Sequence, residues 1–330
     1  MLTKKGGPEV LEKVNLPLPE PGSGEVRVKI LATGVGATDI TMRRGRYLYA
    51  PPIPFIPGYE SIGIVDTVGT GVTTLKEGDR VCALLVYGGY ATHVVRGAEH
   101  WVKVPDGLDD VQAVSLILNY VTAYQMIHRK ARLQPGQSAL VNAANGGVGQ
   151  ALLDLLRAHG VSAIGAAAKI RHEIISSYGA IPIEGRLAPL DAGVHRVRPA
   201  GVDAAFDGVG GSSTRQCVLS TRRGGITVWY GFMDAREFSA RASSAFSLFV
   251  GSRLRGRRGS FYGITMLYRK DPAPFVRTFV SSLISSHKRK SLPVSPKGCR
   301  CWMHAKQTSG LKRGASKVKL CSLHKKEHIL

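Results

Sequence analysis

The segment with the most specific chemistry is a glycine-rich run, Asn145-Gly146-Gly147-Val148-Gly149, which follows the apolar residues 139–141. Glycine at 147 permits a close approach of backbone to a pyrophosphate, and glycine at 149 lets a helix pack on the preceding strand. The free N–H groups at the start of such a helix bind phosphate oxygens. In the usual fingerprint spacing, Ala144 stands in the place of the first glycine. We therefore predict a dinucleotide-binding turn at residues 145–149.

The elements around this run have the order that a dinucleotide-binding unit needs. A short apolar strand precedes it, an amphipathic helical pattern follows it, and a second apolar strand ends near residue 167. This is a βαβ unit, which is typical of a parallel sheet. Two later strands, in VDAAFDGVGG and GGITVWYGF, also end in glycines. Tyr230 and Gly231 close the second of these and are predicted to lie where the cofactor passes.

Basic residues follow the second strand, at the place where an NAD-dependent enzyme has Asp or Glu. The stretch from Ala166 to His172 contains Lys169 and Arg171, and its first acid comes later, at Glu173. A cation here suits the 2′-phosphate of NADPH, although both residues also fit the solvated start of a helix. We favour NADPH as the cofactor, with at least one of the two residues bound to its phosphate.

The part of the chain before residue 108 is predicted to be rich in strands. Residues 25–35 alternate apolar and polar side chains with a period of two, and 61–68 and 78–85 are similar runs between glycine-rich turns. The prolines of segment 51–60 are incompatible with a helix or a central strand, so we expect an ordered loop. From about residue 108 the spacing becomes helical, and the Asp pair 109–110 suits a helix N-terminus.

Five segments carry a family resemblance: GVGATDITMRRGRY, IPGYESIGIVDTVGTGVTTLKEGDRV, NAANGGVG, GVDAAFDGVGG and GGITVWYGF. Together they resemble the medium-chain dehydrogenase/reductase superfamily, and within it the zinc-free quinone oxidoreductases of the zeta-crystallin type and their vesicle amine transport protein-like relatives. The resemblance implies a GroES-like, β-rich catalytic domain at residues 1–115 and a Rossmann domain, with a doubly wound parallel sheet that binds NADPH, at 116–250. It also implies a return segment toward the catalytic domain at 251–275, and usually a homodimer.

Two positions within this resemblance bear on metal chemistry. Zinc alcohol dehydrogenases have Cys in the segment matching residues 34–39 and His in the segment matching 57–60, because a thiolate and an imidazole hold the catalytic ion. This sequence has Gly36 and Tyr59 there, and no cysteine between Cys82 and Cys217 to form a structural zinc lobe. We expect no metal, and hydride transfer from NADPH to a quinone or an α,β-unsaturated carbonyl. Zinc-dependent alcohol dehydrogenase chemistry is the disfavoured alternative.

The resemblance also supplies three candidates for the reacting site. Tyr47 matches the tyrosine of the family's RxGxY element, and either donates a hydrogen bond to the acceptor or is a packed aromatic. Asp39 matches a family position and is expected to brace a loop rather than to transfer protons. Thr122 matches a threonine beside the nicotinamide, although a threonine on a helix surface is the ordinary interpretation. Family members often have Asn where Gly36 stands, so the resemblance does not predict the identity of the substrate.

The charge of the chain is concentrated at its end. Lys+Arg 45 exceed Asp+Glu 23, a formal net charge of +22, and residues 276–330 contain 13 of these bases against one acid. The family's closing helix and strand are missing from this tail. We interpret it as a disordered segment translated from a displaced reading frame, a frameshift that begins near Phe275. Its metal-like set of Cys299, Cys301, His304, Cys321 and His324 is attributed to that unintended frame.

Composition excludes several classes of protein and leaves two further functions open. With 44% hydrophobic and 21% charged residues the chain is not disordered throughout. No apolar run reaches about 18 residues, and the first residues lack the apolar core of a signal peptide, so we expect a cytoplasmic protein without a membrane partner. One alternative is a catalytically impaired NADPH-binding protein with a structural or interaction role. Nucleic-acid binding by the tail is disfavoured, because aromatic residues are scarce there; no specific nucleic acid is expected.

Overall fold

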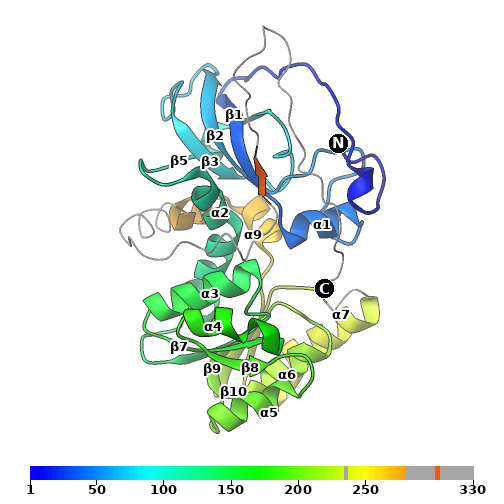
Figure 1. Cartoon of the computed structure of the whole chain (residues 1–330), viewed down its shortest axis with the longest axis vertical. Coiled ribbons are helices and arrows are strands. Elements are labelled where there is room, and N and C mark those ends of the chain that lie inside the picture. Colours follow the sequence, from blue (N-terminus) through cyan, green and yellow to red (C-terminus); the bar gives the residue numbers. More distant parts are fainter. Residues whose placement is uncertain (234–236, 280–301, 305–330) are drawn as a thin grey trace. The chain divides into compact units, whose positions relative to one another are not determined.

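The computed structural model describes residues 1–233, 237–279 and 302–304, which divide into two units (Figure 1). The first unit contains residues 1–118 and the described residues from Tyr268 onward, and the second unit is Asn119–Leu267. The first unit is built on an antiparallel sheet of the strands β1 (Glu25–Gly34), β2 (Glu60–Val68), β3 (Arg80–Leu84), β4 (His93–Gly97), β5 (Val102–Lys103) and β12 (Trp302–His304). Their order is β12-β1-β2-β3-β5, and β4 also pairs with β1.

The strands of the first unit arise from the alternating segments of the sequence. Val26, Val28 and Ile30 of β1 point to one side and are buried in a common core with Val65 of β2 and Val81 of β3. The three strands predicted at 25–35, 61–68 and 78–85 are therefore confirmed as β1, β2 and β3. The predicted loop at 51–60 is also confirmed, because it has no helix or ladder strand before β2, apart from an isolated bridge between Phe55 and Leu2.

Short helices complete the described part of the first unit. Helix α1 (Ala37–Arg43) follows β1 and precedes the proline-rich loop. Two 3₁₀ turns, η1 (Pro8–Val10) and η2 (Ala98–His100), lie elsewhere in it. Residues 273–279 are helical and follow helix α9 (Ile264–Lys270), within which the division between the units falls.

The second unit is built on a parallel sheet. Its strands are β6 (Ser138–Asn142), β7 (Ser162–Ala167), β8 (Ile181–Glu184), β9 (Val202–Asp207), β10 (Thr221–Trp229) and β11 (Arg258–Phe261). They lie in the order β11-β10-β9-β6-β7-β8, and each of these neighbouring pairs is parallel. The strand order reverses direction between β6 and β9, as in doubly wound sheets, and ligands of such sheets bind beyond the carboxyl ends of the strands at that place.

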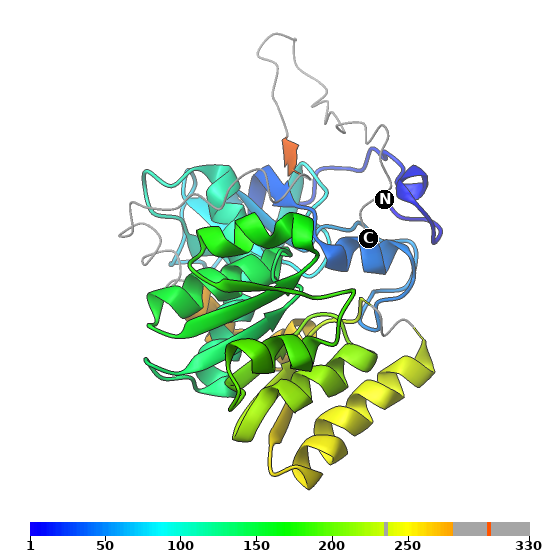
Figure 2. The ribbon, with the colours of Figure 1, turned by 60° about the horizontal axis from the view of Figure 1, so that its bottom comes forward.

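Helices alternate with these strands and cover the sheet (Figure 2). They are α3 (Gly147–Ala158), α4 (His172–Ser177) after the 3₁₀ turn η4 (Lys169–Arg171), α5 (Leu190–Val197), α6 (Ser212–Ser220), and α7 (Phe238–Ala245), which continues through η5 (Phe246–Gly251) into α8 (Ser252–Leu254). Helix α2 (Asp110–Gln125), with its π-helical continuation η3 (Met126–Ala131), crosses the division between the units after Leu118. The predicted helix after residue 108 is confirmed as α2, and Asp109 caps it by accepting hydrogen bonds from the N–H groups of Val111 and Gln112.

The fold class expected from the sequence is confirmed: a GroES-like antiparallel sheet and a Rossmann-like parallel sheet. The expected disorder and displaced frame of residues 276–330 lie for the most part outside the described residues, as does the metal-like set of cysteines and histidines. Two short stretches of that tail are described, and both have regular structure. Residues 276–279 are helical, and Trp302–His304 pair as β12 with Ala32–Gly34 of β1.

Candidate functional site

The predicted glycine-rich turn connects β6 to α3 at the carboxyl edge of the parallel sheet. Gly146 is the N-cap of α3 and provides no side-chain cap. Gly149 must be glycine, because a Cβ there would lie 2.3 Å from the carbonyl oxygen of Ala143. The first N–H groups of α3 consequently have no side-chain acceptor on the N-cap residue, and the helix dipole adds a partial positive charge at the same place. This is the geometry that binds a phosphate group.

The backbone of the turn has one left-handed residue, Ala143, whose φ is 59°. Ala144, which stands in the place of the first glycine of the fingerprint, does not share this conformation. Ala144 is fully buried and its N–H donates to the carbonyl oxygen of Ala166, which ties the turn to β7. The residue of this turn whose backbone favours glycine is therefore Ala143.

Other residues of the turn lie around the start of α3. The carbonyl oxygen of Asn145 accepts a hydrogen bond from Nε2 of Gln150, which stiffens the turn, and the neighbouring Val148 lies in the first turn of α3. A Cβ at Gly147 would come within 2.8 Å of the side-chain amide of Asn119, so α2 borders the helix start at that point. The structure thus brings all five predicted residues, 145–149, together at one helix N-terminus.

Thr122 belongs to the same helix face as Asn119, because residues three apart on a helix are neighbours. Its side chain is buried, and Thr122 Oγ1 and Gln125 Nε2 have no hydrogen-bond partner within the described part of the chain. Tyr262 Oη donates to the other amide atom, Gln125 Oε1, at 3.3 Å. Two buried polar atoms without partners cost stability, so this end of α2 has hydrogen-bonding capacity available for a polar ligand group.

Lys169 and Arg171 form the exposed 3₁₀ turn η4 directly after β7. Among the described residues, neither side chain makes an ion pair. The turn is held through its backbone, because Lys169 N–H donates to the carboxylate of Glu184 at the end of β8. Arg186 N–H donates to the same carboxylate. These backbone donors lower the pKa of Glu184, and Arg186 N–H makes the largest contribution. The two cationic side chains are therefore free to bind an anion.

Tyr230 and Gly231 follow β10 at the carboxyl edge. The N–H of Tyr230 donates to the carbonyl oxygen of Asp207 at 2.9 Å, and a Cβ on Gly208 would lie 2.7 Å from Tyr230 Oη. Burial raises the pKa of Tyr230, and the Asp207 carboxylate adds to that rise. A Cβ on Gly231 would approach the carbonyl oxygen of Gly208 to 2.0 Å. The pair thus closes the sheet edge tightly beside the last residues of β9.

Sequence reasoning missed Asp207, which is the polar centre of this edge. Its buried carboxylate accepts five hydrogen bonds, from the side chains and backbone of Asn142, Val209, Gly210, Ser213 and Thr214. It connects the end of β6 to the turn before α6 and so fixes the carboxyl ends of neighbouring strands. The signal in the sequence was a single acid between an apolar strand and glycines, in the segment AAFDGVGG.

In the first unit, Asp39 braces two loops. Its carboxylate accepts the N–H of Gly36 at 2.9 Å and the N–H of Gly58 at 3.2 Å, which joins the start of α1 to the proline-rich loop. Burial raises the pKa of Asp39 to about 6, although these backbone donors oppose the rise. The geometry corresponds to the bracing role expected from the sequence. No evident signal distinguished the next buried acid, Glu60, which the sequence reasoning missed.

Glu60 lies at the start of β2 and is almost completely buried. Within the described part of the chain its carboxyl group accepts one hydrogen bond, from the N–H of Leu118 in α2 to Oε2 at 2.7 Å. Burial raises the pKa of Glu60 to about 8, and the nearby Asp39 carboxylate adds to the rise. The side chain is therefore largely protonated at neutral pH, and only a neutral carboxyl can donate as well as accept a hydrogen bond.

Tyr47 is half-buried in the first unit, beyond α1. Its hydroxyl lies 3.4 Å from the hydroxyl of Tyr59, which is fully buried, and its ring meets Tyr49 edge to face. The phenol is thus partly exposed and held by a second phenol. Asp39 and Tyr47 belong to the first unit, whereas Thr122, the glycine-rich turn, η4 and Tyr230 belong to the second. Within the described residues, no group of three or more His, Cys, Asp or Glu side chains is arranged to hold a metal ion.

An antiparallel GroES-like sheet and a Rossmann-like parallel sheet with a glycine-rich turn are the two parts expected of a medium-chain dehydrogenase/reductase. Residues 22–106 match the alcohol dehydrogenase GroES-like domain family. The chain is 34% identical over 238 residues to the synaptic vesicle membrane protein VAT-1 homolog of Rattus norvegicus, and this match covers 71% of the chain and 59% of the rat protein. It is 39% identical over 164 residues to the rat quinone oxidoreductase, across 49% of the chain and 50% of that protein.

A solved mycobacterial structure, complexed with NADPH, agrees with this result. It is 26% identical, has a TM-score of 0.74, and the alignment covers 89% of each chain. The chain belongs to the medium-chain dehydrogenase/reductase superfamily, in the branch that holds the quinone oxidoreductases and the VAT-1 homologs. The match spans 59% of the length of the rat VAT-1 homolog and half that of the quinone oxidoreductase. No helix within the described ranges has the length and apolar character to cross a membrane.

Proposed function

We propose that this protein is a zinc-independent, NADPH-dependent oxidoreductase that reduces a quinone or an α,β-unsaturated carbonyl. The observation that carries the proposal is the carboxyl edge of the parallel sheet in the second unit. There the uncapped start of α3 offers N–H groups to a pyrophosphate, and the exposed cations of η4 follow β7 where the 2′-phosphate of NADPH would need them. The NADPH complex of the mycobacterial relative supports the same choice.

The residues present fit this cofactor. The turn at 145–149 would hold the pyrophosphate, and Lys169 and Arg171 the 2′-phosphate, while Tyr230 and Gly231 border the same edge. When bound, NADPH supplies the hydride. Thr122 has a buried hydroxyl without a partner in the described structure, and it would hydrogen-bond the amide of the nicotinamide.

Zinc independence is proposed from the residues at the two positions where a thiolate and an imidazole would be needed. Gly36 has no side chain to offer, and the hydroxyl of Tyr59 lies against Tyr47 in the core of the first unit. A phenol is a poor ligand for zinc compared with cysteine or histidine. Without a Lewis acid the acceptor must already be polarised, as the carbonyl of a quinone or an enone is.

We propose that Tyr47 donates a hydrogen bond to the carbonyl oxygen of the acceptor, where negative charge develops as the hydride arrives. Tyr47 is half-buried, whereas its neighbour Tyr59 is fully buried. Asp39 acts as a positioning residue, because it fixes Gly36 and Gly58 on either side of this loop. The hydride would leave a hydroquinone monoanion, and the single proton that completes the reduction would come from solvent, since no acid–base dyad is needed for a quinone.

The homodimer is a further proposal. β11 is the edge strand of the parallel sheet, and the preceding helical segment exposes Phe246, Phe249 and Val250. An exposed apolar stripe beside an open strand edge is a typical surface for pairing of two copies. Light scattering of the purified protein would show a mass of two chains, and a monomer at micromolar concentration would contradict this part of the proposal.

The decisive experiment combines binding and turnover. Purified protein, dialysed against a zinc chelator, is titrated with NADPH by fluorescence and then assayed for NADPH oxidation with 1,4-benzoquinone and with an enone. We expect binding and turnover that zinc does not increase. Binding without turnover would instead support an impaired NADPH-binding protein, and turnover that needs added zinc would contradict the zinc-independent mechanism. The variant Tyr47→Phe is expected to lower kcat about tenfold or more without changing the affinity for NADPH.

A further inference from the structure

The opposite, amino-terminal edge of the parallel sheet in the second unit carries a concentration of arginines. We call this set the arginine cluster: Arg222, Arg223, Arg253, Arg255, Arg257 and Arg258. Five of the six side chains are exposed, and Arg257 is half-buried. The cluster comes from two segments of the chain that are thirty residues apart, TRRGG at the start of β10 and SRLRGRRG before β11.

Two glycine turns bring these segments together. Gly224 and Gly256 both have a left-handed backbone, with φ of 75° and 64°, and Gly224 N–H donates to the carbonyl oxygen of Gly256 at 2.7 Å. The guanidinium of Arg223 consequently lies over the other turn, with its Nε 3.5 Å from the place where a Cβ on Gly256 would be. The two arginine-rich segments therefore form one continuous surface.

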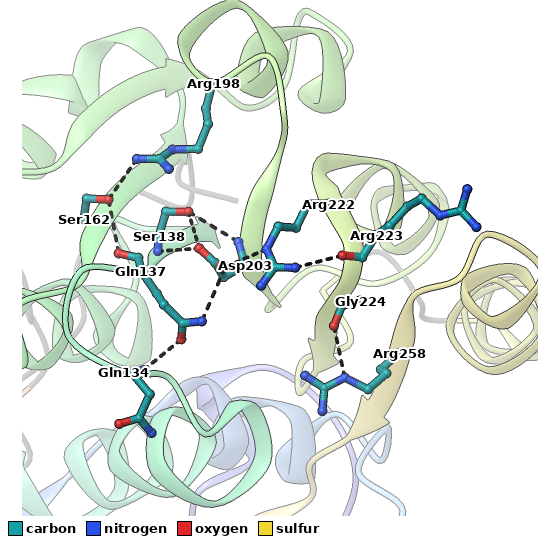
Figure 3. Close-up of polar contacts among 10 residues, drawn as sticks. All are labelled: Gln134, Gln137, Ser138, Ser162, Arg198, Asp203, Arg222, Arg223, Gly224 and Arg258. Carbon is teal, nitrogen blue, oxygen red and sulfur yellow. Dashed lines mark hydrogen bonds and ion pairs between the residues drawn. The ribbon is translucent and has the colours of Figure 1, made fainter.

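Backbone carbonyl groups fix several of the guanidinium groups. Arg258 Nε donates to the carbonyl oxygen of Gly224 at 3.3 Å, and Arg222 Nη1 donates to that of Arg223 at 2.9 Å (Figure 3). Arg255 Nη1 donates to the carbonyl oxygen of Gly251 at 2.9 Å. Each of these groups keeps further N–H donors, because a guanidinium has five. The cluster is thus ordered before any ligand is present.

Acidic side chains do not balance this charge. Among the described residues only Arg222 of the cluster forms an ion pair, with Asp203 at 2.7 Å, and Asp203 also accepts hydrogen bonds from Ser138 and Gln137. In Figure 3 the guanidinium of Arg223 extends away from every other side chain drawn. Arg257 Nε is buried and has no partner in the described structure. Burial, and then the charge of Arg255, lower the pKa of Arg257.

We propose that the arginine cluster is a binding site for a phosphate-bearing anion with several negative charges. Like charges held this close destabilise the fold, and a polyphosphate or a multiply phosphorylated headgroup would both offset that repulsion and use the remaining N–H donors. An acidic carboxylate partner is a poorer match, because fixed planar guanidinium groups on two turns suit several phosphate oxygens at once.

This site is separate from the site proposed for NADPH. The arginine cluster lies at the amino ends of β10 and β11, whereas the glycine-rich turn and η4 follow the carboxyl ends of β6 and β7. Because the strands are parallel, the two sites lie at opposite edges of one sheet, about 20 Å apart for strands of six residues. Binding at the cluster therefore does not depend on whether the proposed reductase function is correct.

The test is a calorimetric titration of the full chain with inorganic tripolyphosphate at two salt concentrations, together with flotation of the protein with vesicles that contain a phosphorylated inositol headgroup. We expect binding in at least one arm, weakened by salt, with an increase in the melting temperature of the protein on addition of the anion. The double variant Arg223→Gln, Arg255→Gln is expected to weaken binding about tenfold or more. The arm that binds identifies the free or the membrane-held source.

Three controls make the result decisive. The variant Lys13→Gln, Arg215→Gln removes the same charge from exposed places outside the cluster and is expected to bind like the wild type. The variant Lys169→Gln, Arg171→Gln alters the proposed NADPH site and is expected to retain the binding at the cluster. Arg223→Glu reverses one exposed charge, and a loss of binding with an unchanged melting temperature shows that folding is intact. No binding by the wild type, or equal weakening in the cluster variant and the charge-matched control, would overturn the proposal.

Discussion

Two buried carboxyl groups, one in each unit, are treated very differently by their surroundings. Asp207 of the second unit accepts five hydrogen bonds, whereas Glu60 of the first unit has one, from Leu118 N–H. Hydrogen-bond donors replace the water that a carboxyl group loses when it is buried. Asp207 therefore connects the end of β6 to the turn before α6. Glu60 lacks that compensation, and burial raises its pKa to about 8. Asp207 is thus surrounded by donors that fix its position, while Glu60 is buried with a single donor and a raised pKa.

The largest effect is expected where the compensated carboxyl is altered. Asp207→Asn leaves the donors of Ser213, Thr214 and the backbone around Asp207 with an amide that offers one acceptor and two donors of its own. We expect a loss of about 3 kcal/mol or more in the free energy of unfolding, measured by urea denaturation, because a buried network is broken. Asp106→Asn, at an exposed position, is the matched control and should change stability little. A loss in the free energy of unfolding as small as that of Asp106→Asn would show that the five hydrogen bonds to Asp207 do not stabilise the fold.

Glu60→Gln tests the effect of the buried carboxyl group that has a single hydrogen-bond donor. The folded-state pKa of Glu60 is raised from 4.5 to about 8, so the stability it contributes is fully present below pH 4.5 and is lost as pH rises through 8. Ionisation of Glu60 should cost on the order of a few kcal/mol of stability between these pH values, and Glu60→Gln, a neutral isostere, should remove that part of the wild-type loss. The part that comes from Asp39, whose pKa burial raises to about 6, should remain. Glu77→Gln, at an exposed position, should leave the slope unchanged. Identical pH profiles for Glu60→Gln and the wild type would contradict the assignment.

A smaller effect is expected in the turn after β6. Ala143→Gly should stabilise the protein by about 0.5–1 kcal/mol, because it relieves a left-handed alanine whose φ is 59°. Ala144→Gly is the matched comparison and should destabilise by a similar amount, since Ala144 is buried and its backbone is not left-handed. Thermal melting of the two variants decides the matter. If Ala144→Gly raised the melting temperature and Ala143→Gly lowered it, Ala144 would be the position of this turn that favours glycine.

Local patterns in the sequence were sufficient for most of the fold. Alternation predicted β1, β2 and β3, and the run from residue 138 to 167 predicted β6, α3 and β7, because periodicity and glycine spacing are properties of neighbouring residues. The left-handed backbone of Ala143 could not be predicted, since the fingerprint fixes the spacing of its residues but not the residue at which the chain leaves the strand.

The parts that could not be predicted depend on contacts between distant segments. Glu60 resembles any other acid in the sequence, and its unusual environment arises from Leu118, 58 residues away. The same holds for Asp207 and its partner Asn142, 65 residues apart. The arginines at 222–223 and 253–258 were visible as basic residues, but only the contact between two glycine turns makes them one surface.

We propose that the second unit selects NADPH through the cations that follow β7. The direct measurement is a fluorescence titration of the wild type and of the variant Lys169→Gln, Arg171→Gln with NADPH and with NADH. We expect the wild type to bind NADPH at least about tenfold more tightly than NADH, and the variant to lose this preference while its affinity for NADH is unchanged. Equal affinity of the wild type for both cofactors, or a preference that survives in the variant, would contradict it.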